Sequence, residues 1–343
     1  MADFNVNHIS SKQGQQGPVM AGITTVSSTG AMRFPSGPTD HRGGRGRGIF
    51  AGGIPSTSAI QLIEIATTGN STSFGNLRFE NSAPSGNLSS STRGYYVGTY
   101  EQPADALATT MQYVVFSSQG GVTYFGDLGS GRSAIGTASN STRGLLYGGD
   151  NPDYLSVLDY ITLSSTGTES SFGTVLDSVA LRNTAGTQSP TRAVWGGGGH
   201  SSMLRSIAYS TFATKGDALE FGQLTGVRAD GVGASNSTRG LFAGGKTPTV
   251  IGTIDYVTIA TLGDGLDFGD LSQARRNLAG MSNSVRGVFA AGCTTGSGPS
   301  GNVNTIDYVT IASAGNATDF GDATAAARQW NSGNSDSHGG LGN

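Results

Sequence analysis

Cysteine and lysine are scarce in this sequence, and each scarcity excludes a class of protein. Cys293 is the single cysteine among 343 residues, which excludes an internal disulfide and a metal site built from clustered cysteines. Charged residues make up 13% of the chain and the formal net charge is -3, so nothing indicates a nucleic-acid partner. The basic residues are 17 arginines and only three lysines: Lys12, Lys215 and Lys246.

Long apolar runs are missing too, and histidine is rare. No stretch of 18 apolar residues occurs, so we expect no insertion into a membrane. Met1–Phe4 lacks the basic and apolar parts of a signal peptide. No pair among the four histidines has the spacing of metal ligands, so we expect no metal, no cofactor and no catalytic residue. The histidines are His8, His41, His200 and His338.

Glycine, in contrast, is abundant, and the chain repeats itself. The 56 glycines exceed the usual ~7%, as expected for tight turns between closely packed strands. The phrase Thr-Arg-Gly stands at 142–144 and again at 238–240, each time followed by an apolar run and Gly-Gly. Spacings of 46, 50, 49, 47 and 47 residues separate six equivalent arginines, which indicates a repeat architecture. These arginines are Arg47, Arg93, Arg143, Arg192, Arg239 and Arg286.

Three further anchors recur in the same order within each unit. One is an apolar run such as 306–312. The second is a Phe-Gly pair, with its phenylalanine at Phe74, Phe125, Phe172, Phe221, Phe268 and Phe320. The third is a second arginine, at Arg78, Arg132, Arg182, Arg228, Arg276 and Arg328.

Each unit contains four short strands. In the last full unit, 276–283, 286–292, 305–312 and 317–322 carry strand-forming residues separated by Gly, Asn and Ser. Four antiparallel strands per unit, covered on both faces, are typical of a β-propeller. The first unit lacks its own first strand, and 328–332 reads as an extra one at the other end. The sequence therefore predicts an all-β, six-bladed propeller over 47–343, closed by its C-terminal strand and preceded by an extended N-terminal arm and Gly/Arg-rich hinge over 1–46.

The order of the anchors resembles the kelch repeat, whose second strand ends in Gly-Gly. Here that pair stands at 52–53, 148–149 and 244–245, and Phe-Gly replaces the kelch tryptophan. The resemblance covers about 47–343 and implies a kelch-like propeller. Galactose oxidase is a kelch-type enzyme, but its copper site needs clustered Tyr, His and a modified Cys, which Cys293 alone does not supply. The arginine cluster of six-bladed sialidases is no better match, because the arginines here recur in every blade.

The recurring arginines predict a structural role. The residue before the strand tyrosine is acidic in only three units, at Asp159, Asp255 and Asp307. Because the acid varies and the arginine does not, we expect the guanidinium groups to donate mainly to backbone carbonyls. The Asn-Ser-Thr triplet at 236–238 falls at a repeated turn, so we interpret it as a turn and not as a glycosylation site.

The two faces of the predicted ring differ. Loops 1–2 and 3–4 of each blade lie on one side, which we call the uniform face because its turns repeat. Loops 2–3 and 4–1 lie on the other side, the variable face. Function concentrates in variable loops on a rigid scaffold, which makes seven loop residues candidates for partner binding: Tyr100, Glu101, Gln102, Tyr154, His200, Met203 and Arg205. The alternative interpretation, ordinary solvated loops, stays open for each.

A second resemblance concerns the amino-acid sequence of the repeats. The segments 306–312 and 315–322 resemble repeats in structural proteins of marine tailed phages, including cyanophages, and the arm over 22–37 looks like attachment segments of the same group. The resemblance implies a non-enzymatic virion protein, made in the host cytoplasm and located on the tail or capsid surface. The implied partners are other virion proteins through 1–46, further copies of the chain, and a host-surface glycan or receptor. A tail fibre or adhesin is preferred, a capsid decoration protein is the alternative, and a polysaccharide-acting enzyme is the third.

Overall fold

The computed structural model describes residues 25–26, 32–33, 46–82, 86–102, 106–199, 201–296 and 299–342. The chain divides into two units, Met1–Thr39 and Asp40–Asn343. In the first unit, β1 (Thr25–Val26) pairs with β2 (Met32–Arg33) in an antiparallel ladder. Apart from β1, β2 and residue 46, the predicted arm and hinge over 1–46 lie outside the described residues.

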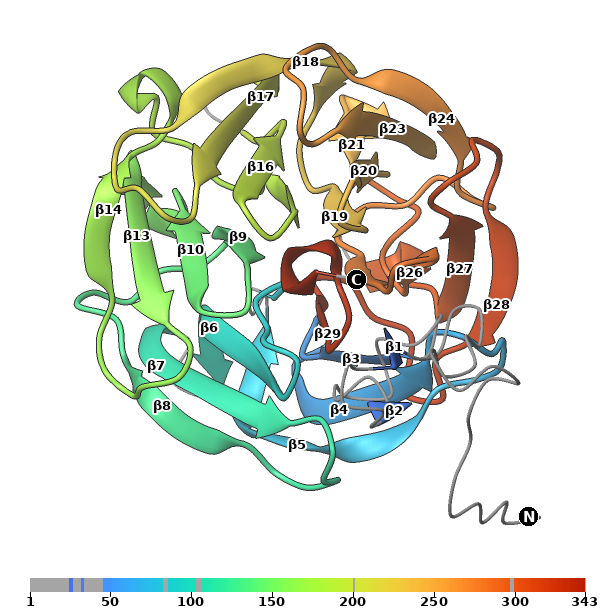
Figure 1. Ribbon diagram of the computed structural model, residues 1–343. Coiled ribbons are helices and arrows are strands. Elements are labelled where there is room, and N and C mark those ends of the chain that lie inside the picture. Colours follow the sequence, from blue (N-terminus) through green and yellow to red (C-terminus); the bar gives the residue numbers. More distant parts are fainter. Residues whose placement is uncertain are drawn as a thin grey trace, which may run out of the picture. The chain divides into compact units, whose positions relative to one another are not determined.

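The second unit is a ring of six blades, which confirms the predicted propeller (Figure 1). Blade 3 is typical: β9 (Gly136–Ser139) is innermost, followed outward by β10 (Arg143–Tyr147), β13 (Val157–Thr162) and β14 (Ser170–Thr174). Blades 4, 5 and 6 follow the same plan. Their strands are β15 (Ala185–Gln188), β16 (Arg192–Gly196), β17 (Leu204–Thr211) and β18 (Leu219–Arg228); β19 (Val232–Ser235), β20 (Arg239–Ala243), β23 (Thr253–Thr258) and β24 (Leu266–Asp270); and β25 (Ala279–Ser282), β26 (Arg286–Ala290), β27 (Thr305–Thr310) and β28 (Thr318–Asp322).

The C-terminal strand completes blade 1, as the sequence predicted. β29 (Ser332–Ser335) pairs antiparallel with β3 (Arg47–Ala51), with Ser332 opposite Ala51 and Ser335 opposite Gly48. Outward from β3 come β4 (Thr57–Glu64) and β5 (Thr72–Ser82). The ring is therefore fastened where β29 meets β3, and the inner edge of β3 is paired.

Blade 2 departs from the plan. It contains β6 (Arg93–Gln102), β7 (Ala106–Val115) and β8 (Thr123–Asp127), and its inner position holds a single bridge between Ser89 and Gly94. The ends of β5 and β6 pair with each other, so blades 1 and 2 form one seven-stranded sheet. The sequence predicted six blades but not this pairing between the first two. The additional pairing arises because β5 and β6, of 11 and 10 residues, extend beyond the lengths of their counterparts in most other blades.

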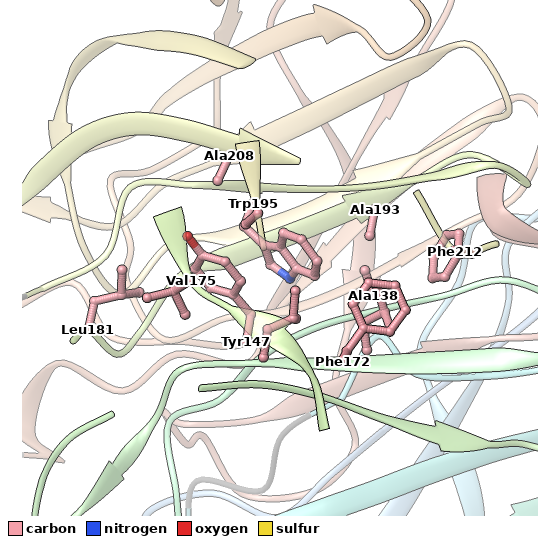
Figure 2. Packing of buried hydrophobic residues seen from close by; sticks show 12 residues of the cluster. Ala138, Tyr147, Phe172, Val175, Leu181, Ala193, Trp195, Ala208 and Phe212 are labelled. Atoms are coloured by element: carbon pink, nitrogen blue, oxygen red, sulfur yellow. The ribbon is translucent and has the colours of Figure 1, made fainter. Parts of the chain in front are cut away.

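The core lies between the blades. Six clusters of buried apolar side chains each join two neighbouring blades. In the cluster between blades 3 and 4, Tyr147 stacks on Trp195 with ring centroids 4.5 Å apart (Figure 2). Four of the five inner strands, β9, β15, β25 and β29, are buried along their whole length and consist mostly of small residues, because the inner strands converge on one axis.

The loops of the variable face contain two short hairpins and two 3₁₀ turns. They are the hairpin of β11 (Asp150–Asn151) and β12 (Asp153–Tyr154), the hairpin of β21 (Lys246–Thr247) and β22 (Thr249–Val250), and the 3₁₀ turns η2 (Leu176–Ser178) and η3 (Pro299–Gly301). A last 3₁₀ turn, η4 (Gly339–Leu341), follows β29 near the axis of the ring (Figure 1).

Candidate functional site

On the uniform face, the repeated arginines link each blade to the next. Arg192 donates through Nη1 to the carbonyls of Ile259 and Ala260 at 3.0 and 2.9 Å, which lie just beyond the third strand of the following blade. Four others make the same contact, and the carbonyl bonding predicted for them is confirmed. Their acceptors are Phe116 for Arg47, Phe212 and Ala213 for Arg143, Ile311 and Ala312 for Arg239, and Ile65 and Ala66 for Arg286.

In blade 2 a tyrosine provides this link. The hydroxyl of Tyr95 donates to the carbonyl of Leu163 in blade 3, and Arg93 lies over the ring of Tyr113 at 4.5 Å. Similar cation–π contacts accompany the arginines of blades 3 to 6, and each tyrosine meets the Phe-Gly phenylalanine of its own blade edge-on. The motif residues of one blade thus form a single stack.

The Phe-Gly pair makes a second link between blades. The carbonyl of Phe172 accepts a hydrogen bond from Gly216, in the 3–4 turn of the next blade, at 3.0 Å. A side chain on Gly173 would place its Cβ 2.2 Å from the carbonyl oxygen of Gly216. Both contacts recur at all six junctions, which explains why glycine follows the phenylalanine in every unit.

The turns of the uniform face are also fixed by their own side chains. Asn236 Oδ1 accepts from the backbone N–H groups of Thr238 and Arg239 at 3.0 and 2.7 Å, and Asn140 does the same for Thr142 and Arg143. This confirms the turn interpretation of the Asn-Ser-Thr triplet. The repeated residues of the uniform face are thus engaged in holding the ring together.

The second set of arginines adds carboxylate partners. Arg228 and Asp255 are buried and form an ion pair at 3.0 Å, and Arg132 and Asp159 form another at 2.8 Å. Arg228 also donates through Nη1 to three backbone carbonyls, as predicted, whereas the prediction of mainly carbonyl partners is wrong for Arg132. The aspartate before the tyrosine neutralises a guanidinium that burial would otherwise leave uncompensated.

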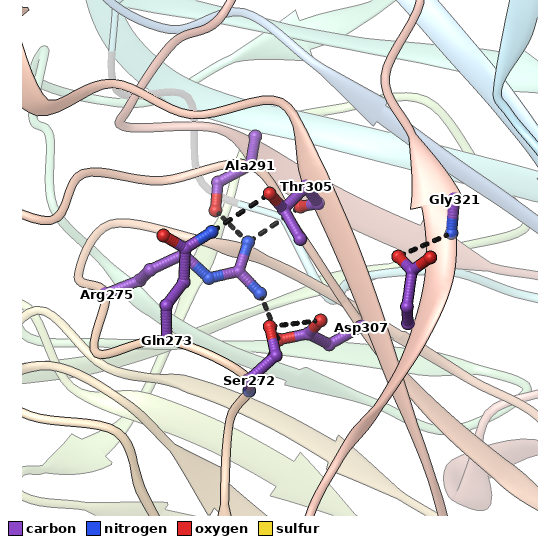
Figure 3. A network of polar contacts seen from close by, with 8 residues as sticks. Ser272, Gln273, Arg275, Ala291, Thr305, Asp307 and Gly321 are labelled. Atoms are coloured by element: carbon purple, nitrogen blue, oxygen red, sulfur yellow. Dashed lines mark hydrogen bonds and ion pairs between the residues drawn. The ribbon is translucent and has the colours of Figure 1, made fainter.

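Blade 6 shows the full network (Figure 3). The buried partner of Asp307 is Arg275, at 2.6 Å, which directly precedes the repeat arginine Arg276. Arg275 also donates to the carbonyls of Ala291 and Thr305, and Ser272 donates to the Asp307 carboxylate. Desolvation lowers the pKa of Arg275, which the neighbouring carboxylate partly offsets.

The inner strands narrow the channel at the axis through a ring of glycines. A Cβ on Gly280 would lie 2.3 Å from the carbonyl oxygen of Gly233. In the same way, a Cβ on Gly333 would lie 2.3 Å from the carbonyl oxygen of Gly280. On the variable-face side of this ring is a cavity of about 110 Å³. It is lined by the first residues of the inner strands from all six blades. The sequence did not predict this cavity.

On the uniform-face side, the C-terminal segment crosses the axis. His338 is fully buried and its Nδ1 accepts from the N–H of Gly340 and from Gln188 Nε2, at 3.1 and 3.0 Å. Its Nε2 lies 3.1 Å from the carbonyl of Ser89, so the ring is the neutral tautomer with the proton on Nε2. The sequence placed His338 in a tail without a role. The structure makes it a contact between blades 2 and 4.

His338 predicts a dependence of stability on pH. Burial lowers its pKa from the usual 6.5 to about 4, so the unfolded chain takes up the proton first as the pH falls. The contribution is complete above about pH 6.5 and is lost as the pH drops toward 4, and the loss at pH 4.5 is on the order of 2–3 kcal/mol. Urea unfolding at pH 7.5 and 4.5 measures this change. His338→Gln should flatten it, and equal pH slopes for the two proteins would contradict the assignment.

The described candidate residues are spread over blades 2, 3 and 4 and do not share one loop. Tyr100 is 38% exposed on β6. Tyr154 on β12 lies over the guanidinium of Arg182 at 4.8 Å. In blade 4, Met203 is half-buried and Arg205 is exposed. The backbones of Glu101 and Gln102 pair with β5, while their side chains and the whole of His200 lie outside the described residues.

No protein-family model and no curated protein matches the chain. In the part that the structure describes, no group of three or more His, Cys, Asp or Glu is arranged to hold a metal ion. Within those same residues, no helix has the length and apolar character needed to span a membrane.

Proposed function

We propose that this protein is a non-enzymatic structural protein of a phage virion, attached through its N-terminal arm and displaying the propeller for recognition of a host-surface glycan. The resemblance of its repeats and arm to structural proteins of marine tailed phages supports a virion location. A tail fibre or tail-associated adhesin is the position that this role requires.

The observation that carries the proposal is the contrast between the two faces of the ring. The residues that repeat on the uniform face make contacts between blades, as the Arg192 and Phe172 contacts illustrate. The loops of the variable face differ in each blade, with hairpins at β11–β12 and β21–β22 and a turn at η2. A scaffold whose contacts between blades repeat and whose exposed loops differ from blade to blade is typical of a recognition module.

Rigidity supports the same role. The ring is closed by β29, and each junction between blades has its own apolar cluster. Loops held on such a scaffold lose little conformational entropy when a partner binds. The exposed Tyr100 and Arg205, and Tyr154 beside Arg182, provide aromatic and cationic groups of the kind enriched at binding hot spots.

Binding to an array of bacterial surface polysaccharides tests the proposal. The triple variant Tyr100→Ser, Tyr154→Ser and Arg205→Ser should bind about tenfold more weakly or worse. A matched control replaces three exposed residues of the outermost strands: Tyr124→Ser, Leu219→Ser and Leu266→Ser.

Three outcomes would contradict the proposal. The first is equal binding by the two triple variants. The second is attachment to assembled phage heads through residues 1–46 without binding to any surface polysaccharide, which is the behaviour of a capsid decoration protein. The third is turnover of a polysaccharide, which is the behaviour of an enzyme.

A further inference from the structure

Blade 4 lacks the buried ion pair of blades 3, 5 and 6, and a small cavity lies in its place. Leu181 and Ala208 stand at the positions that Arg275 and Asp307 occupy in blade 6, and both are shorter than the residues they replace. A cavity of about 80 Å³ lies beside them, between blade 4 and Tyr147 of blade 3. Its walls are mostly apolar. We call it the interblade slot.

The parts of the slot that solvent reaches belong to the variable face. Val179, in the 4–1 loop after η2, is 36% exposed, and Leu204, which begins β17 after a 2–3 loop, is half-buried. Both line the slot. The candidate residue Arg205 stands between Leu204 and a second lining residue, Ser206. The slot is therefore continuous with the surface that carries the candidate residues.

Tyr147 provides the slot with a hydrogen-bond donor. Its hydroxyl accepts the backbone N–H of Leu176 at 3.1 Å, and its own hydrogen has no acceptor within the described residues. Figure 2 shows this hydroxyl on the side of the ring where Leu181 and Ala208 lie. Burial raises the pKa of Tyr147, so the phenol keeps its hydrogen at neutral pH and acts as a donor.

Tyr147 does not belong to the repeat. The corresponding positions of the other blades hold small residues or valine: Ala51, Val97, Gly196, Ala243 and Ala290. The contacts that build the ring therefore do not need a tyrosine here, and a buried phenol with a free hydrogen is a feature of this junction alone among the six. An unpaired buried donor costs free energy unless a partner supplies an acceptor.

Size and polarity restrict what the slot can hold. A cavity of about 150 Å³ holds benzene, which corresponds to about 25 Å³ for each heavy atom. The slot of about 80 Å³ then has room for about three heavy atoms, too few for a sugar ring. Apolar walls favour a methyl group, and the Tyr147 hydroxyl favours an acceptor beside it. Among the described lining residues only Asp177 is charged, which disfavours a carboxylate as that acceptor.

We propose that the interblade slot binds the acetamido group of an N-acetylhexosamine in a surface glycan. The methyl group packs against Leu181 and Ala208, the carbonyl oxygen accepts from the Tyr147 hydroxyl, and the N–H and the sugar ring stay at the mouth. The acetyl group combines a methyl, a carbonyl carbon and an acceptor oxygen, which are the three heavy atoms that the slot has room for. The inference rests on the proposed recognition role and names the chemical class of its ligand.

Saturation-transfer NMR with matched methyl glycosides tests the slot. The probes are methyl N-acetylglucosaminide and methyl N-acetylgalactosaminide, each compared with the methyl glucoside or galactoside that carries a hydroxyl in place of the acetamido group. Methyl fucoside supplies a methyl group without an acceptor. At least one N-acetyl glycoside should bind in the millimolar range, about tenfold more tightly than its hydroxyl counterpart. The acetyl methyl should receive the strongest saturation, because it is the group inside the slot.

Two variants separate binding in the slot from folding. Ala208→Val places two further carbons in the empty volume, so it should abolish N-acetyl glycoside binding while the melting temperature stays equal or rises. Thr211→Val is the matched control: it is exposed on the same strand, β17, and outside the slot, so it should change neither. Tyr147→Phe should weaken the N-acetyl glycoside about fivefold, the loss expected for one neutral hydrogen bond, and leave the hydroxyl counterpart unchanged.

The outcomes separate the slot from the proposed function. Unchanged N-acetyl glycoside binding by folded Ala208→Val overturns the slot, and so does polysaccharide binding that depends on the variable-face triple variant but not on Ala208→Val. Tighter binding of methyl fucoside, or strongest saturation on the sugar ring, overturns the assignment to an acetamido group. N-acetyl glycoside binding without binding of any polysaccharide overturns the proposed function alone. If neither class of ligand binds, both proposals fall.

Discussion

A chain that ends at Ala327 is expected to lose its cooperative thermal transition. The truncation removes β29, whose four residues are buried and pair with β3, and leaves the edge of β3 open beside Ile49 and Phe50. It also removes Asn334, which accepts from the N–H of Leu88 and donates to the carbonyl of Tyr95. Blade 2 depends on that side chain because it has only a single bridge at its inner position.

The expected loss is comparable with the whole stability of a domain, about 5–15 kcal/mol. Circular dichroism during heating and size-exclusion chromatography would show it as a broad transition and an expanded or associated chain. A peptide covering 328–343, added in excess, should restore the sharp transition. A truncated chain that melts like the intact one without the peptide would show that blade 1 is stable with three strands.

Replacing the buried carboxylate of blade 6 is expected to have the second-largest effect. Asp307→Asn leaves the guanidinium of Arg275, which is fully buried, without a counter-charge. Loss of one partner from a buried pair costs about 3–5 kcal/mol. Urea unfolding measures the change, and Asp319→Asn in the exposed strand β28 is the matched control with an expected effect near zero.

Blade 4 shows which residues can replace the ion pair of blade 6. Its residues at the positions of Arg275 and Asp307 are Leu181 and Ala208, both part of a buried apolar cluster. The double variant Arg275→Leu with Asp307→Ala should therefore recover most of the stability lost in Asp307→Asn, because a packed apolar pair needs no counter-charge. A double variant less stable than the single one would mean that the ion pair itself stabilises the blade.

The fold was predictable because each sequence anchor corresponds to one contact between neighbouring blades. The anchors to which Arg239 and Phe172 belong recur at regular spacing because each junction between blades needs the same contact. The pairing of β5 with β6 was not predictable, because it depends on how far two strands continue past the end of the motif. Arg275 and Arg276 are adjacent and both are buried, so spacing alone did not identify the one that pairs with Asp307.

The candidate site was predictable only in its location. The sequence identified the variable face from the loops that fail to repeat, and Tyr154 does lie there beside Arg182. It missed the axial cavity because its lining residues come from different units, as Asn183 and Asn331 do. It missed His338 because the path of the chain after β29 follows no repeat.

The pairing of β29 with β3 has a consequence for how the protein is made. β3 leaves the ribosome some 280 residues before its inner partner, β29. Until then blade 1 has an unpaired inner edge, and closure of the ring has to wait for β29. A translation product that stops before β29 therefore lacks the closed ring.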